Sequence, residues 1–468
     1  MTDRPRRVHF VGIGGIGMSG IAELLANLGY RVSGSDARAS DITRRLEGLG
    51  VRVHEGHDAA NVGDAEVVVI TSAARPDNPE IVEARRRGIP VIARAEMLAE
   101  LMRLRRVGIA IGGAHGKTTT TSMVALMLER AGLDPTAVIG GRLSAFGSNA
   151  RLGQSELIVA EADESDGSFL KLAPRYSVIT NVDREHLDHY GTFENALEAF
   201  VAFANTVPFD GAVVVGVDDP VLARLLPRMT RRVVTYATDR EDAHLVARHI
   251  ESGQGQTRCE VWRRSSPDAG ASEEQLGTLQ LNVPGRHNLR NALAAVGIGL
   301  ELDVPFDRIA AGLGEFRGAE RRLQVIGEQA GVLVVDDYGH HPTEIAAVVA
   351  ACREAWSRRL VLLFQPHRYT RTANLLQEFA SELAKADQVC LLPIYAASED
   401  PLPGVTSDVL AEAITAAGGK PVHLIDGLSE APSSMAAIAQ TGDLIVTLGA
   451  GSVGTLGPRV LEALEARR

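Results

Sequence analysis

Short apolar runs alternate along this chain with segments that have helical spacing. Each run is rich in β-branched residues and is followed by a polar or glycine-rich turn. Several runs are apolar throughout, as strands are when helices cover both faces of a parallel sheet. The pattern therefore predicts an α/β fold with mostly parallel sheets. The strands that we predict are residues 8–11, 67–70, 107–111, 157–160, 178–180, 213–215, 332–335, 360–364, 389–392 and 444–448.

The length of 468 residues predicts about three domains, at roughly 150 residues each. A new strand and a glycine-rich loop follow residues 103–106, and a fresh α/β series follows residues 314–318. The polar stretch 240–276 is rich in Ser, Gly, Gln and Glu, and we expect it to form a surface hairpin region of the middle domain. The domains that we expect are residues 1–105, 106–315 and 316–468.

Composition indicates an enzyme of the cytoplasm. The chain is 45% hydrophobic and 23% charged, which is ordinary for a globular protein with several cores. Its net charge of −11 disfavours general binding to nucleic acid or to anionic membranes. Cys259, Cys352 and Cys390 form no C-x-x-C pair, which argues against a disulfide framework or a sulfur-rich metal site. No run reaches the roughly 18 apolar residues of a membrane-spanning helix. We expect no nucleic-acid or membrane partner.

A first glycine-rich loop, GIGGIGMSG at residues 12–20, follows a predicted strand and precedes a helical segment. Glycines let the backbone approach a phosphate, and the amide groups at the start of a helix attract it. Asp36 follows the short segment 32–35, VSGS, and its carboxylate is suited to accept a hydrogen bond from a ribose hydroxyl. The motif predicts a nucleotide-like ligand without identifying it, and a tight turn without a ligand is the alternative.

A second glycine-rich loop, GGAHGKTTTT at residues 112–121, lies between a predicted strand and a helix that runs to about Ala131. It resembles a P-loop, in which amide groups surround phosphate oxygens. Lys117 would place a positive charge on the transferred phosphate, and Thr118 would offer its hydroxyl to Mg²⁺. The loop is a shorter variant, because Ile111 stands five positions before Gly116, where the usual motif has glycine.

Two polar segments follow predicted strands and are candidates for a metal site. The segment 161–169 reads EADESDGSF, and carboxylates this close repel one another unless a cation neutralises them. Mg²⁺ is the simplest explanation, and a solvated acidic loop is the alternative. The segment 180–191 reads TNVDREHLDHYG. There His186 and Asp188 are suited to bind metal or phosphate, whereas His189 is as well suited to packing.

Three further motifs lie towards the C-terminus. In GRHNLRNALAA, residues 285–295, Asn288 and Asn291 share a helix face and are suited to a purine edge, with helix capping as the alternative for Asn288. DDYGHHPTE at 336–344 and FQPHRYTRT at 364–372 each begin at the end of a predicted strand. Arg368 and Arg371 suit a carboxylate, because guanidinium groups bind carboxylates in a bidentate manner.

As a set, these motifs resemble the Mur ligases, the ATP-dependent amino-acid ligases of peptidoglycan synthesis. GAHGKTT is similar to the family's G-T-[NH]-G-K-T-[ST], with Ala114 where threonine is usual. The other motifs, with FRGAERR at 316–322, follow in the family's order and at suitable distances. The Tyr338 form of DDYGHHPTE and the loop GIGGIGMSG look like those of the members that add L-alanine. The resemblance implies a Rossmann-like N-terminal domain, a central P-loop ATPase-type domain and a Rossmann-like C-terminal domain.

Carried over position by position, the resemblance implies ATP and Mg²⁺ as cofactors, with Mn²⁺ as a possible substitute. The P-loop contacts to ATP would come from Gly113, His115, Gly116, Lys117, Thr118 and Thr119. Further ATP contacts would come from Asn288, Asn291, Arg322 and Asp337. The metal ligands would be Thr118, Glu161 and His186.

The resemblance also implies two further substrates, UDP-N-acetylmuramate and L-alanine. The sugar nucleotide would bind Gly14, Gly15, Gly17, Ser19, Asp36, Thr71 and Ser72. Alanine would bind Tyr338, His340, Arg368 and Arg371. The residues that would take part in catalysis are Lys117, His186, His340, Arg368 and Arg371. We expect a monomer or a homodimer.

The implied reaction activates the lactyl carboxylate of the sugar nucleotide as an acyl phosphate, which the amine of L-alanine then attacks. Three alternatives stay open. A ligase of cell-wall recycling would attach a preformed tripeptide to the same sugar nucleotide. An NAD-dependent oxidoreductase would account for the first glycine-rich loop and Asp36, but not for Lys117. A nucleotide-controlled binding protein would bind ATP and release no phosphate.

Overall fold

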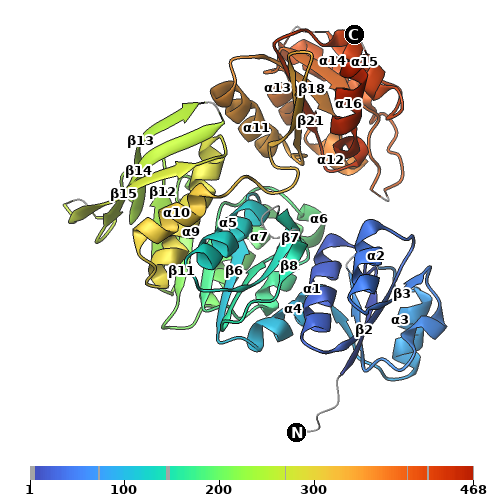
Figure 1. The fold of residues 1–468 in the computed structure, drawn as a ribbon, viewed down its shortest axis with the longest axis vertical. Helices are drawn as coiled ribbons and strands as arrows, with labels where there is room; N and C mark the ends of the chain where they lie inside the picture. The colour runs from blue at the N-terminus through green and yellow to red at the C-terminus, as the bar shows by residue number, and fades with distance from the viewer. Residues whose placement is uncertain are drawn as a thin grey trace. The chain divides into compact units, whose positions relative to one another are not determined.

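The computed structural model describes residues 6–71, 74–143, 148–253, 255–268, 270–397, 399–418 and 421–466. The chain divides into two compact units. Unit 1 comprises Met1–His249, Cys259–Leu279 and Leu289–Phe316, and unit 2 comprises Ile250–Arg258, Gln280–Asn288 and Arg317–Arg468. Three mostly parallel sheets confirm the predicted α/β class (Figure 1). The expected domain boundaries after residues 105 and 315 stay a prediction.

The first sheet has the order β3-β2-β1-β4-β5, and all neighbouring strands are parallel. Phe10 packs in one buried cluster with Leu24 of the following helix, whereas Val11 packs in another with Ala84. Because successive strand residues point to opposite faces, helices cover both faces of this sheet. The strands are β1 (Arg7–Val11), β2 (Arg31–Asp36), β3 (Arg52–Glu55), β4 (Val67–Ile70) and β5 (Val91–Ala93). The helices are α1 (Ile16–Asn27), α2 (Asp41–Gly48), α3 (Pro79–Arg86) and α4 (Arg94–Arg103).

The second sheet has the order β15-β14-β13-β12-β11-β10-β6-β9-β7-β8. The P-loop follows β6, which is parallel to both of its neighbours, and leads into α5, whose residues 119–128 are all buried. The strands are β6 (Val107–Gly112), β7 (Thr136–Leu143), β8 (Ser148–Arg151), β9 (Leu157–Glu161), β10 (Tyr176–Ile179), β11 (Ala212–Gly216), β12 (Val233–Ala237), β13 (Leu245–Gly253), β14 (Gln256–Arg264) and β15 (Glu273–Leu281). The helices are α5 (Lys117–Arg130), α6 (Leu187–Tyr190), α7 (Phe193–Asn205), α8 (Pro220–Leu225), α9 (Arg286–Glu301) and α10 (Phe306–Gly314).

The third sheet has the order β16-β17-β21-β18-β19-β20, and only its β16–β17 pair is antiparallel. Leu362 and Phe379 belong to one buried cluster and Leu363 and Met435 to another, so helices cover both faces here too. The strands are β16 (Gln324–Gln329), β17 (Val332–Asp337), β18 (Arg359–Phe364), β19 (Gln388–Leu391), β20 (Val422–Leu424) and β21 (Asp443–Leu448). The helices are α11 (Pro342–Ala355), α12 (Tyr369–Asn374), α13 (Leu376–Leu383), α14 (Ser407–Gly418), α15 (Ala431–Ile438) and α16 (Leu456–Glu465).

Every strand predicted from the sequence is present, with ends within two residues of the prediction. The polar stretch 240–276 forms β13, β14 and the start of β15, in agreement with the expected hairpin region. Among the described residues, no helix is both long enough and apolar enough to cross a bilayer.

The cysteines take part in no disulfide. Cys259, Cys352 and Cys390 are free and buried, as their separate positions in the sequence predict. Burial raises the pKa of each thiol, to about 12 for Cys259 and Cys390. All three thiols are therefore protonated at neutral pH.

A buried carboxylate lies beneath the first glycine-rich loop. Glu80 is 0% exposed, and it accepts hydrogen bonds from Ser35 Oγ at 2.6 Å and Asn61 Nδ2 at 2.7 Å. His9, also fully buried, has its Nε2 3.8 Å from Glu80 Oε1. Burial acts to raise the pKa of Glu80, but bonds from His9, Ser35 and Asn61 outweigh it and lower the pKa to about 2. Glu80 is thus ionised inside the fold.

Ser35 connects this carboxylate to the loop. Its carbonyl oxygen accepts the amide hydrogens of Gly12 at 2.8 Å and Ile13 at 2.9 Å. Its hydroxyl donates to Glu80 at the same time. The Glu80 network therefore fixes the end of β2 against the turn that leaves β1.

We predict that Glu80→Gln destabilises the protein by about 1–3 kcal/mol at pH 7, because an amide cannot accept all the bonds that the carboxylate accepts. The folded pKa of Glu80 is about 2, below the usual 4.5, so its stabilisation is full above pH 4.5 and is lost as pH falls towards 2. Urea unfolding should show the difference between wild type and variant shrinking over that interval. Glu47→Gln, at an exposed position on α2, is the control. A difference that does not change with pH would contradict the prediction.

Candidate functional site

The second glycine-rich loop is packed so closely that two of its positions have no room for a side chain. Gly113 has φ 131° and Gly116 has φ 84°, in the region that favours glycine. A Cβ atom on Gly113 would lie 2.0 Å from Thr180 Oγ1, and one on Gly116 would lie 2.6 Å from Asn291 Oδ1. The structure thus brings Asn291 of α9 to the P-loop, next to the start of α5.

Lys117 is the first residue of α5, and its side chain is directed back to the P-loop backbone. Its Nζ donates to the carbonyl oxygens of Gly113 at 2.7 Å and Ala114 at 3.0 Å, and to Glu164 Oε1 at 2.9 Å. Burial acts to lower the pKa of Lys117, but the charges of Glu164 and Asp163 outweigh burial and raise it. The loop therefore holds a fixed ammonium group beside an acidic segment.

The acidic segment after β9 supplies two buried carboxyl groups. Glu161 accepts hydrogen bonds from the amide of Gly140 at 2.5 Å and from Thr118 Oγ1 at 3.3 Å. Burial raises the pKa of Glu161 and raises that of Glu164 to about 7. Glu164 is 3% exposed, and its buried Oε2 has no hydrogen-bond partner among the described residues. A buried oxygen of this kind requires an explanation, and a bound cation would be one.

His186 approaches the same carboxyl group from the segment after β10. Its Nε2 lies 3.7 Å from Glu164 Oε1 and 3.7 Å from Glu185 Oε2. Ligand atoms of Glu164, Glu185 and His186 lie within 4.8 Å of one another. Two carboxylates and an imidazole at this spacing fit a divalent cation such as Mg²⁺ or Mn²⁺. The structure groups His186 with these two residues, and it pairs the other predicted ligands, Thr118 and Glu161, with each other.

The remaining polar residues after β10 hold the P-loop or face away from it. His115 donates its amide hydrogen to Asn181 Oδ1 at 2.8 Å, and its ring Nε2 lies 2.8 Å from Asp183 Oδ2. Neither Asn181 nor Asp183 was singled out from the sequence, although both lie within the quoted motif. His189 is exposed and packs edge-on against Tyr190. The side chain of Asp188 lies outside the described residues.

Two residues predicted to bind ATP are buried in the structure. Thr119 is 5% exposed on α5. Asn288 donates from Nδ2 to the carbonyl oxygen of Pro284 at 2.7 Å, instead of accepting an amide hydrogen as an N-terminal cap does. Helix capping therefore does not explain Asn288.

The first glycine-rich loop accepts support from Asp36, the acidic residue that the sequence analysis assigned to the same ligand site. Asp36 Oδ2 accepts the amide hydrogen of Gly14 at 2.8 Å, so this carboxylate supports the loop itself. Gly15 precedes α1 without a side-chain capping bond, and it is exposed. The first amide groups of α1 are thus not satisfied by a capping side chain, which is the usual state of an anion-binding helix end.

Other residues predicted for the sugar nucleotide surround this loop. Thr71 follows β4, and its Cγ2 would lie 3.2 Å from a Cβ atom on Gly12. Ser19 is fully buried and donates to the carbonyl oxygen of Ile16 at 3.0 Å. Ser72 lies outside the described residues. The loop, Thr71 and Asp36 therefore lie together at the carboxyl end of the first sheet.

In unit 2, Arg322 and Asp337 form one buried cluster. Asp337 accepts the amide hydrogens of Leu323 at 2.8 Å and Gly339 at 2.7 Å, and burial raises its pKa to about 6. Arg322 donates to Glu344 Oε1 at 3.2 Å. Burial acts to lower the pKa of Arg322, but Glu344 and Asp337 raise it overall. Arg322 is thus held by Glu344 of α11, and Asp337 by the two backbone amides.

Four rings form a row that begins at Tyr338, the residue after Asp337. The ring centroids of Tyr338 and His340 are 5.4 Å apart, those of His340 and His367 are 5.7 Å apart, and those of His367 and Tyr395 are 5.4 Å apart. The rings come from the segments after β17, β18 and β19, at the carboxyl edge of the third sheet. His367 and Tyr395 were not predicted, although His367 lies in the motif FQPHRYTRT.

The predicted arginines border this row. Arg371 Nη1 lies 3.4 Å from His367 Nδ1. Burial, followed by the charges of His340 and Arg371, lowers the pKa of His367 to about 4, so its ring is neutral and can accept from the guanidinium. Arg368 has φ 73° and donates its amide hydrogen to the carbonyl of Tyr395 at 2.8 Å. The residues predicted for alanine therefore lie together.

Three family models match this chain in sequence order. They are described as "Mur ligase family, catalytic domain" for residues 7–106, "Mur ligase middle domain" for residues 111–299 and "Mur ligase, glutamate ligase domain" for residues 321–451. The chain belongs to the Mur ligase family. Mur ligases are ATP-dependent, which is at odds with the alternative of an NAD-dependent oxidoreductase.

Individual Mur ligases are similar over the whole chain. The UDP-N-acetylmuramate–L-alanine ligase of Anaeromyxobacter sp. (strain Fw109-5) is 52% identical over 99% of both chains. The crystal structure of the UDP-N-acetylmuramate–alanine ligase of Thermotoga maritima gives a TM-score of 0.82 at 28% identity, over 99% of this chain and 100% of that one. The UDP-N-acetylmuramate:L-alanyl-γ-D-glutamyl-meso-diaminopimelate ligase of Neisseria meningitidis gives 0.60 at 30% identity, over 68% of this chain and 100% of that one. The three-domain fold predicted from the sequence is thereby confirmed.

The P-loop packing predicts that Gly116→Ala weakens ATP and ADP binding by about tenfold or more. A left-handed backbone costs a non-glycine residue about 1–2 kcal/mol, and the new Cβ would displace Asn291. Calorimetric titration of each nucleotide measures the effect. Gly48→Ala in α2 is the matched control, since its Cβ would meet nothing within 4 Å. Unchanged nucleotide affinity in Gly116→Ala would exclude this loop as the phosphate site.

Proposed function

We propose that this chain ligates L-alanine to the lactyl carboxylate of UDP-N-acetylmuramate, with ATP converted to ADP and phosphate. The structural observation that carries the proposal is the buried Lys117–Glu164 pair in the P-loop, beside an acidic segment with an unpartnered oxygen. The substrates are supported by the 52% identity with a UDP-N-acetylmuramate–L-alanine ligase over 99% of both chains. The reaction would serve peptidoglycan precursor synthesis in the cytoplasm.

ATP would bind with its phosphates on the amide groups of the P-loop, where α5 begins. The ammonium of Lys117 would turn from Glu164 towards the transferred phosphoryl group and stabilise the charge that develops on its oxygens. Asn291, which lies against Gly116 in unit 1, would contact the rest of the nucleotide. Mg²⁺ would be held by residues among Thr118, Glu161, Glu164 and His186, and would supply neutralisation of phosphate charge when bound.

The sugar nucleotide would bind at the carboxyl end of the first sheet, with its diphosphate at the start of α1. Its lactyl carboxylate attacks the γ-phosphorus of ATP, the bond to the bridging oxygen breaks, and ADP leaves. The product of this step is an acyl phosphate. Water would hydrolyse this acyl phosphate, so the reaction requires that water is excluded from the site while the intermediate is present.

Alanine would be held by the ring row of unit 2. Arg371 and Arg368 bind its carboxylate, and neutral His367 orients Arg371 by accepting its N–H. Tyr338 and His340 lie beside this pair, and His340 is the candidate to receive the proton of the substrate ammonium group. The free amine then attacks the acyl carbon, and inorganic phosphate leaves from the tetrahedral intermediate.

The second candidate is attachment of a preformed tripeptide to the same sugar nucleotide. It is supported by the 30% identity with the Neisseria meningitidis tripeptide ligase over 68% of this chain. The two candidates share the ATP chemistry and differ only in the amine. The space around Tyr338, His340 and Tyr395 would decide between them.

Phosphate release from Mg-ATP tests the function directly. We expect release only when UDP-N-acetylmuramate and free L-alanine are both present, with mass spectrometry detecting the alanyl product. Release with the alanyl-glutamyl tripeptide but not with alanine would move the protein to recycling. If no amine leads to phosphate release, the protein is not a ligase, and the nucleotide-binding protein is the remaining alternative.

Within this reaction, Lys117→Met should lower kcat by about a thousandfold, since removal of one preorganised transition-state contact costs about 3–4 kcal/mol. Glu161→Gln should instead raise the Mg²⁺ concentration required for half-maximal rate. Lys385→Gln, at a lysine of unit 2 that is 54% exposed, is the control and should keep full activity. A Lys117→Met variant as active as this control would contradict the role of Lys117.

A further inference from the structure

One side chain at the start of α4 lies between the first glycine-rich loop and the acidic segment. Arg94 donates from Nη2 to Asp163 Oδ2 at 2.6 Å. A Cβ atom on Gly17 would lie 2.9 Å from Arg94 Nη1, 3.2 Å from its Cδ and 3.3 Å from its Cζ. The guanidinium group thus lies against the first turn of α1, and Gly17 leaves room for it. Arg94, Gly17 and Asp163 all belong to unit 1.

Asp163 in turn faces the second loop. Its charge is attracted to Arg94 and also to Lys117, the P-loop lysine. Its other oxygen, Oδ1, accepts the amide hydrogen of Ser165 at 3.1 Å, which fixes the carboxylate in place. A continuous set of contacts and charges therefore runs from Gly17 through Arg94 and Asp163 to Lys117.

The chemistry of the guanidinium group explains why arginine occupies this position. It carries N–H donors along more than one edge, so it can bind a carboxylate with one edge and an oxyanion with another. The hydrogen bond from Arg94 to Asp163 uses Nη2. Nη1 lies at the second residue of α1, where the exposed helix start attracts anions.

We propose that Arg94 is a positioning residue that couples the first glycine-rich loop to the acidic segment, by holding the diphosphate of the sugar nucleotide with one edge and Asp163 with the other. This inference rests on the proposed function. When the diphosphate binds, its negative charge is attracted to Arg94, so Arg94 neutralises Asp163 less than before. The net negative charge of the acidic segment therefore increases, and the segment binds a divalent cation more tightly. Binding of the sugar nucleotide and binding of the metal thus strengthen each other.

Two measurements that do not depend on turnover test the coupling. Calorimetry gives the affinity for UDP-N-acetylmuramate, and Mn²⁺ titration followed by electron paramagnetic resonance gives the cation affinity with and without saturating sugar nucleotide. We expect sugar nucleotide to tighten Mn²⁺ binding to the wild type about fivefold, within the usual range of coupling between sites. Mn²⁺ bound by the sugar nucleotide alone is measured in buffer and subtracted.

Arg94→Gln should weaken UDP-N-acetylmuramate binding about tenfold or more and should make Mn²⁺ affinity independent of the sugar nucleotide. Arg94→Lys should recover part of the sugar-nucleotide affinity through its charge, but not the coupling, because an ammonium group lacks the two edges. Asp163→Asn should also abolish the coupling. In a double-mutant cycle, Arg94→Gln and Asp163→Asn should therefore affect the coupling non-additively.

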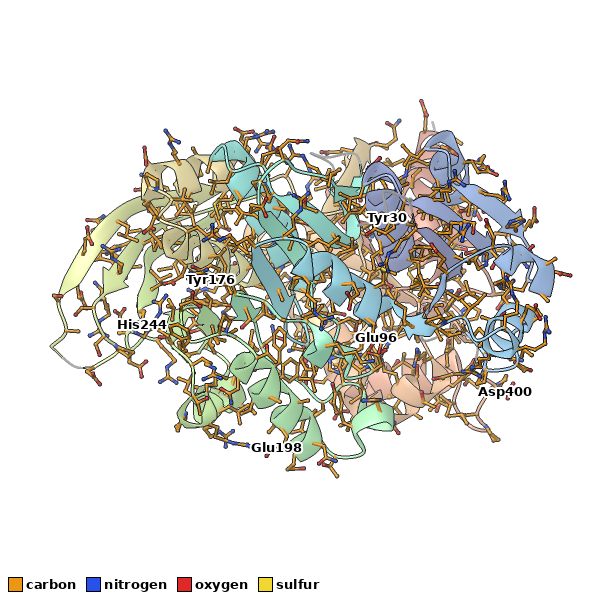
Figure 2. The ribbon with its side chains drawn as sticks, turned by 90° about the horizontal axis from the view of Figure 1, so that it is seen from below. Tyr30, Glu96, Tyr176, Glu198, His244 and Asp400 are labelled. Carbon is orange, nitrogen blue, oxygen red and sulfur yellow. The ribbon has the colours of Figure 1, made fainter. Side chains whose placement is uncertain are left out.

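The matched control is a second ion pair of the same helix. Glu96, labelled in Figure 2, lies two residues after Arg94 on α4 and pairs with Lys171. Both of these side chains are more exposed than that of Arg94. Lys171→Gln removes this pair without touching either loop, so both affinities and the coupling should stay as in the wild type. If Lys171→Gln reproduced the effects of Arg94→Gln, Arg94 would act only by anchoring α4, and the proposal would be wrong.

The remaining outcomes separate this inference from the proposed function. If the wild type binds no UDP-N-acetylmuramate, the proposed function itself fails. If the wild type binds it and forms product, but Arg94→Gln binds it equally well, only the role of Arg94 is overturned. Coupling that persists in Arg94→Gln would mean that the cation meets the diphosphate directly, and this too would overturn the proposal.

Discussion

The burial of Lys117 beside Glu164 is the interaction on which the arrangement of unit 1 depends. An isolated ammonium or carboxylate group would be costly to remove from water, so each requires the other and the carbonyl oxygens of the loop. The glycines at 113 and 116 allow the loop to curl closely enough to supply those oxygens. Among the described residues Glu164 Oε2 has no hydrogen-bond partner, so the pair satisfies the carboxylate only in part. Its other oxygen, Oε1, lies 3.7 Å from His186 Nε2.

Each unit assembles its own candidate groups at the carboxyl ends of its strands. Unit 1 places anion-binding helix starts after β1 and β6 and gathers carboxylates after β9. Unit 2 places arginines and four rings after β17, β18 and β19. In every case the functional segment follows the carboxyl end of a parallel strand, where open α/β sheets bind their ligands. Under the proposed function, phosphate chemistry would fall to unit 1 and amine recognition to unit 2.

The sequence predicted the buried strands well, because strands covered on both faces are apolar throughout. It did not single out β2 (RVSGSD) or β3 (RVHE), whose polar residues hide the pattern and whose pairing depends on β1. Motif residues such as Lys117 and His186 could be found because they follow strands in recognisable order. The partner of Lys117, the support that Asp36 gives to Gly14 and the stacking of Tyr395 on His367 could not be found. Each of these depends on contacts between segments far apart in sequence, which no local pattern records.

The buried cysteines have a practical consequence for spectroscopic study of this protein. With every native thiol enclosed and protonated, thiol-reactive probes will not label the unmodified protein under mild conditions. A single cysteine introduced at an exposed position of each unit would then carry a spin label or a fluorophore without background. The chain is in effect already prepared for spectroscopic distance measurements, with no need to remove its own cysteines first.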